Sequence, residues 1–273
     1  MKLSYLKLDA KRRMMSNTLS CFAVSLLPFF VFSFLVVLNY YLPFFLKKTL
    51  PGTDIFLISF IWVMSIVFSI VLCMGVCLVK EKYFLMRACG KKVKFFKLVR
   101  SISRRQYSMY MKVSVLKILL SLSWSAVYFS PCLVVAILLI YSYRYENYGV
   151  NVNLTLFVAS ILLFLIGASH FFVTLKRYSM CNAIILKDKQ EKPVKIIAES
   201  IDIMENHSVE YSLYCLSFVG WICACIFVFP LFYVLPFINM SKWCYMENIK
   251  KEEKIVIQSE KPIIFYIQKR KEV

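Results

Sequence analysis

The fold is decided by the uncharged stretch IFLISFIWVMSIVFSIVLCMGVCLV, residues 55–79. A helix needs about 20 apolar residues to cross the roughly 30 Å hydrocarbon core of a bilayer, and this stretch exceeds that length. Lipid offers no partner to an unpaired backbone group, so a crossing segment of this kind folds as an α-helix and not as an open strand. The sequence therefore predicts a transmembrane helix over residues 55–79.

Comparable apolar stretches lie on both sides of this one, and they predict three more transmembrane helices. Their residue ranges are 18–46, 113–143 and 154–175. The first contains Pro28 and Pro43, which allow a kink or an early end, and the second contains Lys117 and Pro131.

The last apolar stretch, residues 211–245, is too long for one crossing and short for two. Pro230 and Pro236 lie near its middle, and proline removes a backbone donor and breaks or bends a helix. We therefore expect a tight hairpin of segments 211–228 and 230–245. The predicted fold is an all-α, polytopic transmembrane helical bundle of about six segments, formed by residues 1–246.

Composition supports a membrane protein and excludes several other classes. The 273 residues are 60% hydrophobic, with a mean hydropathy of +0.68, which is too apolar for a soluble domain. The ten cysteines fall mostly within apolar stretches, which excludes a disulfide-stapled secreted scaffold. The net charge of +19 is carried between apolar stretches and not on one polar face, so we expect a lipid bilayer as partner and no nucleic acid.

The distribution of lysine and arginine predicts the orientation of the chain. Basic residues concentrate in residues 1–17, 80–112, 176–210 and the tail after Ser241. Of the 34 lysines and arginines, only four lie elsewhere: Lys47, Lys48, Lys117 and Arg144. Because basic connectors remain on the cytoplasmic side, both termini, the connector 80–112 and the charged tail 247–273 are expected in the cytoplasm. Five crossings would place the tail outside, and so the hairpin is preferred.

The basic connector also predicts a contact with lipid headgroups. Apolar and basic residues interleave at roughly helical spacing over residues 93–102, as in a helix that lies in the headgroup layer. Each basic residue near an anionic leaflet contributes about 1 kcal/mol. The residues expected to contact anionic lipid are Lys91, Lys92, Lys94, Lys97, Arg100, Arg104 and Arg105.

Three polar residues within the predicted crossings are candidates for a functional or packing role. His170 follows the small residues 167–169, which favour a close helix contact, so structural hydrogen bonding is preferred over a proton relay or ligand role. Lys117 lies near a predicted helix end, where a long side chain can reach the interface. Asn39 could line a polar path together with Lys117, Ser169 and His170.

No catalytic, cofactor or metal motif is recognisable. The sequence lacks a glycine-rich phosphate loop, a nucleophile elbow, a zinc-protease motif and paired acidic residues within a crossing. Cys73 and Cys77 would share one helix face, but no spacing brings them to His170 or His207, and a buried packing role is expected. We therefore expect no catalytic residue, no cofactor and no metal, and a protein that is not an enzyme.

Several short motifs carry a family resemblance. They are Tyr178-Ser179-Met180, Met204-Glu205-Asn206-His207, Leu216-Ser217-Phe218-Val219-Gly220-Trp221, Tyr233-Val234-Leu235-Pro236-Phe237, the pairs Leu6-Lys7 and Ala10-Lys11, and Ala88-Cys89-Gly90-Lys91-Lys92-Val93-Lys94-Phe95. Together they resemble an uncharacterised family of bacterial integral membrane proteins, the domain of unknown function numbered nine-seven-five. The chain departs from it at Glu205-Asn206 and in the separate segment 154–175.

The resemblance implies a multi-pass protein of the bacterial cytoplasmic membrane with no established activity, and it marks His207, Gly220 and Trp221 as further candidates. The function expected is that of a non-enzymatic subunit or accessory of an envelope process, such as peptide export, immunity or envelope stress, with a membrane-protein partner. The alternative is a small-solute or lipid transporter with a polar path near His170.

Overall fold

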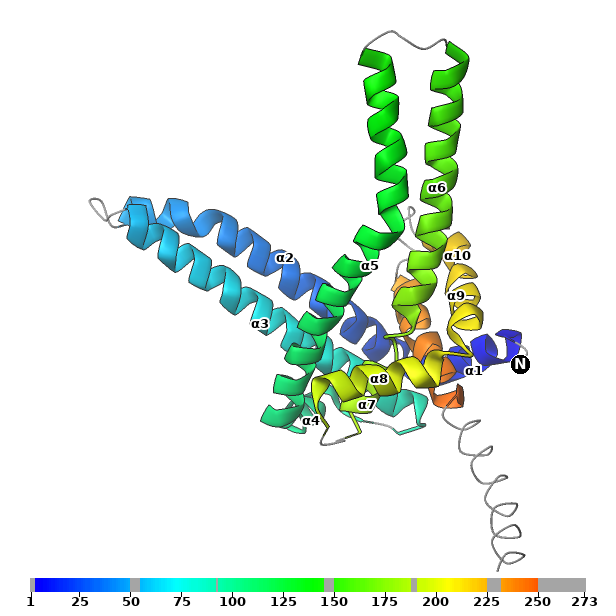
Figure 1. Cartoon of the computed structure of the whole chain (residues 1–273). Helices are drawn as coiled ribbons and strands as arrows, with labels where there is room; N and C mark the ends of the chain where they lie inside the picture. The colour runs from blue at the N-terminus through cyan, green and yellow to red at the C-terminus, as the bar shows by residue number, and fades with distance from the viewer. Residues whose placement is uncertain are drawn as a thin grey trace, which may run out of the picture. The chain divides into compact units, whose positions relative to one another are not determined.

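The computed structural model describes residues 3–49, 55–91, 93–144, 150–187, 191–224 and 232–249. Within these residues every regular element is helical and no strand is present, so the predicted all-α class is confirmed (Figure 1).

In the part of the chain that the structure describes, four helices are long and apolar enough to cross a membrane: α2 (Thr18–Thr49), α3 (Ile55–Ala88), α5 (Arg104–Arg144) and α6 (Val150–Lys176). They contain all of the first four predicted segments. α2 continues through both Pro28 and Pro43, so neither proline ends it early. α3 is longer than its apolar stretch: after Val79 it continues through Lys80, Glu81 and Lys82 to Ala88, beyond the predicted crossing of residues 55–79.

The chain divides into two compact units, Met1–Tyr107 with Phe218–Val273, and Ser108–Ser217. The first, called unit 1, contains the α2–α3 hairpin, α1 (Leu3–Met15), α4 (Phe95–Arg100), α10 (Val219–Ala224) and the helical residues 232–249. The second, unit 2, contains the α5–α6 hairpin with α7 (Cys181–Ile185), α8 (Pro193–Met204) and α9 (Ser208–Leu216). α5 begins in unit 1, four residues before unit 2.

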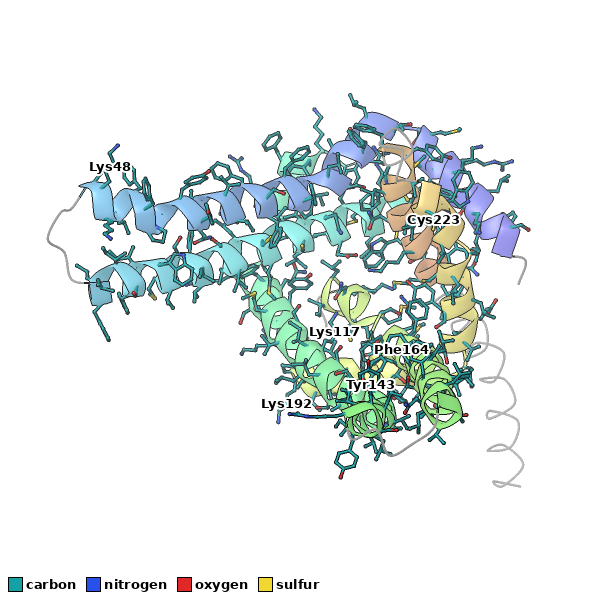
Figure 2. The ribbon with its side chains drawn as sticks, turned by 90° about the horizontal axis from the view of Figure 1, so that it is seen from above. Lys48, Lys117, Tyr143, Phe164, Lys192 and Cys223 are labelled. Atoms are coloured by element: carbon teal, nitrogen blue, oxygen red, sulfur yellow. The ribbon has the colours of Figure 1, made fainter. Side chains whose placement is uncertain are left out.

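The buried side chains gather at the short helices and at the ends of the long ones. In unit 1 they include Leu78, Tyr83, Leu98, Met240 and Trp243, each no more than 2% exposed. By contrast, none of the most apolar 18 residues of α3 or of α5 is buried. Side chains project outward along the α2–α3 hairpin, with Lys48 at its far end (Figure 2). Such extended apolar surface is tolerated where lipid covers it.

The predicted hairpin of two further crossings is not confirmed. α9 has nine residues and spans about 13.5 Å, well short of the hydrocarbon core. It ends at Leu216. The hydroxyl of the next residue, Ser217, donates to the carbonyl of Tyr214 at 2.5 Å, and α10 follows after this break. The expected break at Pro230 lies outside the described residues, and the helical residues 232–249 run through Pro236.

The apolar character of residues 211–245 has another physical cause in the part that the structure describes. Tyr211 and Tyr214 are at most 3% exposed, in a helix that packs on α6. Phe237 and Trp243 are buried in unit 1. These side chains are hydrophobic because they form protein cores, and a hydropathy pattern alone does not distinguish a core helix from a crossing.

Candidate functional site

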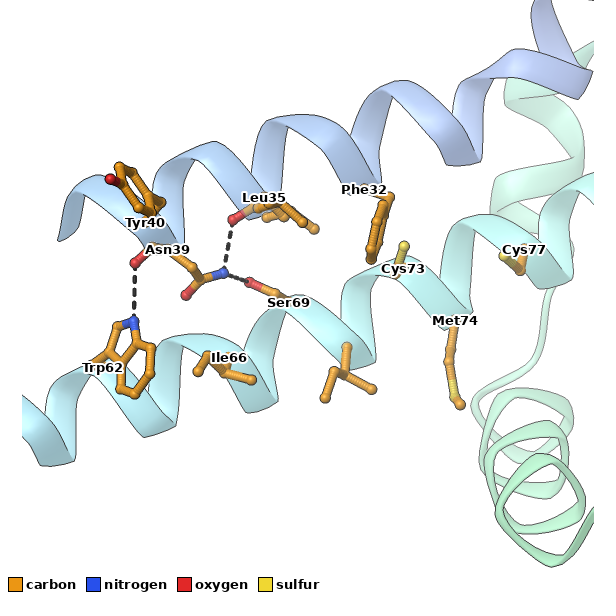
Figure 3. Close-up of a pocket in the computed structure, with 12 residues that line it drawn as sticks. Phe32, Leu35, Asn39, Tyr40, Trp62, Ile66, Ser69, Cys73, Met74 and Cys77 are labelled. Atoms are coloured by element: carbon orange, nitrogen blue, oxygen red, sulfur yellow. Dashed lines mark hydrogen bonds between the residues drawn. The ribbon is translucent and has the colours of Figure 1, made fainter. Parts of the chain in front are cut away.

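A polar clamp joins α2 to α3 within their apolar stretches (Figure 3). The Asn39 amide nitrogen donates to the Ser69 hydroxyl and to the Leu35 carbonyl, both at 2.8 Å. The Trp62 indole donates to the Asn39 carbonyl at 3.0 Å. Interhelical hydrogen bonds of this kind stabilise helix pairs in lipid. Asn39 is thus first of all a packing residue.

Beside the clamp lies a groove of about 530 Å³ between α2 and α3. Its lining is predominantly apolar and includes Phe32, Ile66, Cys73 and Cys77. Cys73 and Cys77 both face it, as their spacing predicts. The Asn39 side-chain oxygen is buried and has no hydrogen-bond partner among the described residues, so it could accept a bond from a donor entering the groove.

His170 lies at a close contact of α5 with α6. A Cβ added at Gly167 would stand 2.6 Å from the Tyr128 carbonyl oxygen, so the two backbones approach as the small-residue run predicts. The exposed imidazole of His170 stacks on the Tyr128 ring, with centroids 6.1 Å apart. The Tyr128 and Thr174 hydroxyls share a hydrogen bond of 3.0 Å. The His170 backbone carbonyl accepts a hydrogen bond from the Thr174 hydroxyl at 2.9 Å, and its ring makes the aromatic contact with Tyr128.

Lys117 has a definite partner on another helix of unit 2. Its ammonium donates to the Asn182 side-chain oxygen at 3.1 Å, and Asn182 is 8% exposed in α7. Two turns further along α5, the Trp124 indole donates to the Tyr178 hydroxyl at 2.9 Å. Tyr178 opens the family motif Tyr178-Ser179-Met180, which therefore ties α5 to the chain beyond α6. Snorkelling alone does not describe Lys117.

A buried ionic cluster at the end of α3 was not anticipated from sequence. Glu81, Lys82 and Arg87 are 8%, 6% and 6% exposed, although all three belong to the connector 80–112 that is expected in the cytoplasm. The Lys242 ammonium lies 3.4 Å from both carboxylate oxygens of Glu81. The Lys82 ammonium donates to the Ser101 carbonyl at 2.8 Å. These partners are 161 and 19 residues away in sequence, and spacing gave no signal for them.

The electrostatics of Glu81 follow from this arrangement, outside the crossing segment. Burial by itself raises the pKa of its carboxyl group, but the nearby Lys242 and Lys80 outweigh it, so the pKa lies below the ordinary value. Glu81 is therefore ionised at neutral pH. Removal of Lys242 would leave a buried, uncompensated charge.

Arg13 connects α1 to the end of α3. The Arg13 guanidinium pairs with Asp9 at 2.9 Å and also donates to the carbonyl of Ala88. The Arg87 guanidinium lies over the Tyr83 ring, 5.6 Å from its centroid. These contacts are structural. In the described part of the chain, no group of three or more His, Cys, Asp or Glu side chains could hold a metal ion.

Beyond the end of α3, the basic connector presents its charges outward. Lys91, Lys94, Lys97, Arg100, Arg104 and Arg105 are all exposed, and Lys92 lies outside the described residues. Within α4, Leu98 is 2% exposed and fixes the helix to its unit, whereas Phe96 is 85% exposed. The predicted helix is thus present, over Phe95–Arg100.

The remaining motif candidates lie apart from these features. Gly220 and Trp221 are exposed, and a Cβ at Gly220 would meet nothing within 4 Å. The buried member of that motif is Phe218. Its ring meets the Phe237 ring edge to face, with centroids 5.6 Å apart, and the Lys7 ammonium lies 4.6 Å from the Phe218 centroid.

His207 precedes α9 directly. It is half-buried, with Nδ1 3.9 Å from the Glu210 carboxylate. Its carbonyl accepts the backbone N–H of Tyr211 at 2.8 Å, which begins the hydrogen bonding of that helix. His207 is therefore the residue that caps the N-terminus of α9 through its backbone.

These features define a multi-pass α-helical membrane protein whose polar side chains mainly connect helices. The family model described as protein of unknown function (DUF975) matches residues 2–253, and the chain belongs to this family. No curated protein and no solved structure matches the chain.

Proposed function

We propose that this protein is a non-enzymatic subunit or accessory of a bacterial envelope process, such as peptide export, immunity or envelope stress, and that it works through contacts made in the cytoplasmic membrane. The observation that supports this is the exposure of its long helices. Phe68 of α3 is 63% exposed and Leu138 of α5 is 51% exposed. Such surfaces are available to lipid and to helices of a partner.

The polar residues of the long helices connect neighbouring helices, which favours the same interpretation. Asn39 connects α2 to α3, Lys117 connects α5 to α7, and Glu81 connects α3 to residues 232–249. Each is engaged in packing within its own unit. A scaffold stabilised in this way is suited to present surfaces, and it needs no reaction centre.

The proposal includes an orientation. Four crossings place residues 3–17, the connector 80–112 and the chain after α6 on one side of the membrane, which we assign to the cytoplasm because these segments are the basic ones. An even number of crossings, four or six, gives the same side to both termini. Four crossings therefore already keep the basic tail in the cytoplasm, which was the reason for expecting a fifth and a sixth segment.

Photo-crosslinking in native membranes tests the proposal. A photoreactive residue is placed at Phe68 or Leu138, and a matched control is placed at Leu78, which is 0% exposed. We expect protein adducts from the exposed positions and none from Leu78. A chain that is recovered alone from both exposed positions, and that is active by itself in a reconstituted transport assay, would refute the proposal.

One observation favours the alternative of a small-solute or lipid transporter. The unpaired side-chain oxygen of Asn39 borders the α2–α3 groove and could bind a donor group. In a variant without native cysteines, a transport path predicts that Asn39→Cys and His170→Cys react with a water-soluble thiol reagent. Protection of both positions would argue against a path.

A further inference from the structure

We propose that the connector between α3 and α5 is a binding surface for the headgroups of anionic phospholipids. This surface, called the basic corner, consists of six exposed cations with Phe96 and Val99 between them. The cations are Lys91, Lys94, Lys97, Arg100, Arg104 and Arg105. The inference rests on the membrane location of the chain and not on its accessory role.

After α3 leaves the predicted crossing, the connector turns back toward the membrane surface. α3 continues beyond Val79 for about 13.5 Å to Ala88 and then turns at Gly90, whose φ of +77° favours glycine. The chain comes back through α4, because the Lys82 ammonium bonds the Ser101 carbonyl at 2.8 Å. Lys82 stands only about 4.5 Å past Val79 along the helix. The end of α4 is therefore near the edge of the apolar stretch.

The start of α5 also contacts the apolar stretch of α3, independently of α4. The Tyr107 hydroxyl donates to the carbonyl of Val71 at 2.6 Å, and a Cβ added at Gly75 would lie 3.4 Å from the Tyr107 ring. Val71 and Gly75 both belong to the apolar stretch of α3. Arg104 and Arg105, within one turn of Tyr107, consequently lie close to where that stretch ends.

The geometry of the basic corner is fixed by local hydrogen bonds. The Gln106 N–H donates to the Ser103 hydroxyl at 3.1 Å, and the Ser103 N–H donates to the Gln106 side-chain oxygen at 3.3 Å. This reciprocal pair is a capping box, which sets the start of α5. Buried Leu98 holds α4. The cations therefore project from a defined backbone.

The positive charge and the exposed apolar side chains of the basic corner favour an anionic phospholipid as its ligand. The sequence contains no acidic residue from Lys82 to Arg144, so none of the six cations has an acidic residue close to it in sequence. Phe96 is 85% exposed and Val99 is 46% exposed, in the midst of these charges. Apolar side chains that enter the acyl boundary beside cations that meet phosphate are typical of a helix at an anionic membrane surface.

The test compares lipid binding by two variants that lose the same charge. Full-length protein in a neutral detergent is titrated with phosphatidylglycerol or phosphatidylcholine, and bound lipids are counted by native mass spectrometry. One variant carries Lys94→Gln, Lys97→Gln and Arg100→Gln in the basic corner. The matched control carries Lys187→Gln, Lys192→Gln and Lys195→Gln, three exposed cations near α8.

Each cation at an anionic surface contributes about a fivefold factor in affinity. We expect the corner variant to lose at least tenfold in affinity for phosphatidylglycerol, with no more than a twofold change for phosphatidylcholine or for the control. Raising the salt concentration should weaken the wild type more than the corner variant. A loss below tenfold, or an equal loss in the control, would overturn the proposal and leave the surface to an acidic protein segment.

The apolar part of the surface is tested separately by Phe96→Gln. This exposed side chain has no core role, so elution volume and melting temperature should not change. We expect a smaller loss of phosphatidylglycerol binding, about threefold. Unchanged binding would show that the surface does not enter the lipid and would contradict the proposed mode of contact.

Discussion

The substitution Gly167→Ala tests the close contact of α5 with α6. The added Cβ would lie 2.6 Å from the Tyr128 carbonyl oxygen, whereas ordinary contacts begin at 3.4 Å. Because the opposing atom belongs to backbone, no side chain can turn aside, and the helices must separate by about 0.8 Å. Overpacking of this kind costs about 1–3 kcal/mol. The better helix propensity of alanine offsets up to about 1 kcal/mol, which leaves a net loss of about 1–2 kcal/mol.

The matched control is Gly220→Ala, where an added Cβ meets nothing within 4 Å. Thermal unfolding of both variants in the same detergent measures the difference. At about 2–4 °C per kcal/mol, we expect Gly167→Ala to melt about 2–8 °C below the wild type. Gly220→Ala should melt at the wild-type temperature or slightly above it. If Gly167→Ala were as stable as Gly220→Ala, the inferred contact between the two backbones would be wrong.

Three further predictions concern the polar contacts, each measured by thermal unfolding. Because the pKa of Glu81 is lowered, its ionised form stabilises the fold above about pH 4.5, and this stabilisation is lost as the pH falls further. Glu81→Gln should therefore flatten the decline in melting temperature between about pH 5 and 3. A decline as steep as that of the wild type would contradict this. Ser69→Ala removes the acceptor of the Asn39 amide and should cost about 0.6–1.7 kcal/mol, and equal stability would refute the clamp. Lys117→Met should cost about 1–3 kcal/mol because Asn182 loses its donor; if Lys117 merely snorkelled, the variant would be at least as stable as the wild type.

The sequence predicted those elements whose signal is local. Long apolar stretches identified the four long helices, and the interleaved basic and apolar residues located α4. The same rule predicted two further crossings, which the described residues do not confirm. Hydropathy alone does not distinguish a helix surrounded by lipid from a helix in a protein core. Tyr214 and Trp243 are as hydrophobic as lipid-facing residues, and tertiary packing alone shows what surrounds them.

The candidate site was predictable to a smaller extent. The small residue Gly167 signalled the close helix contact, and exposed cations were expected in the connector. The pairing of Glu81 with Lys242 was missed, because residues 161 positions apart carry no sign of proximity in one sequence. Phe218 was overlooked beside Gly220 and Trp221 for a similar reason, since burial decides which member of a motif forms the core.

Mapping the side on which each connector lies tests the account most directly. Reporters that distinguish cytoplasm from exterior are inserted at residues 52, 91, 147 and 189, and after residue 273. We predict exterior signals at 52 and 147 and cytoplasmic signals at 91, 189 and the C-terminus. An exterior signal at 91 or at 189 would contradict the proposed orientation, and with it the basic corner as a surface for the anionic cytoplasmic leaflet.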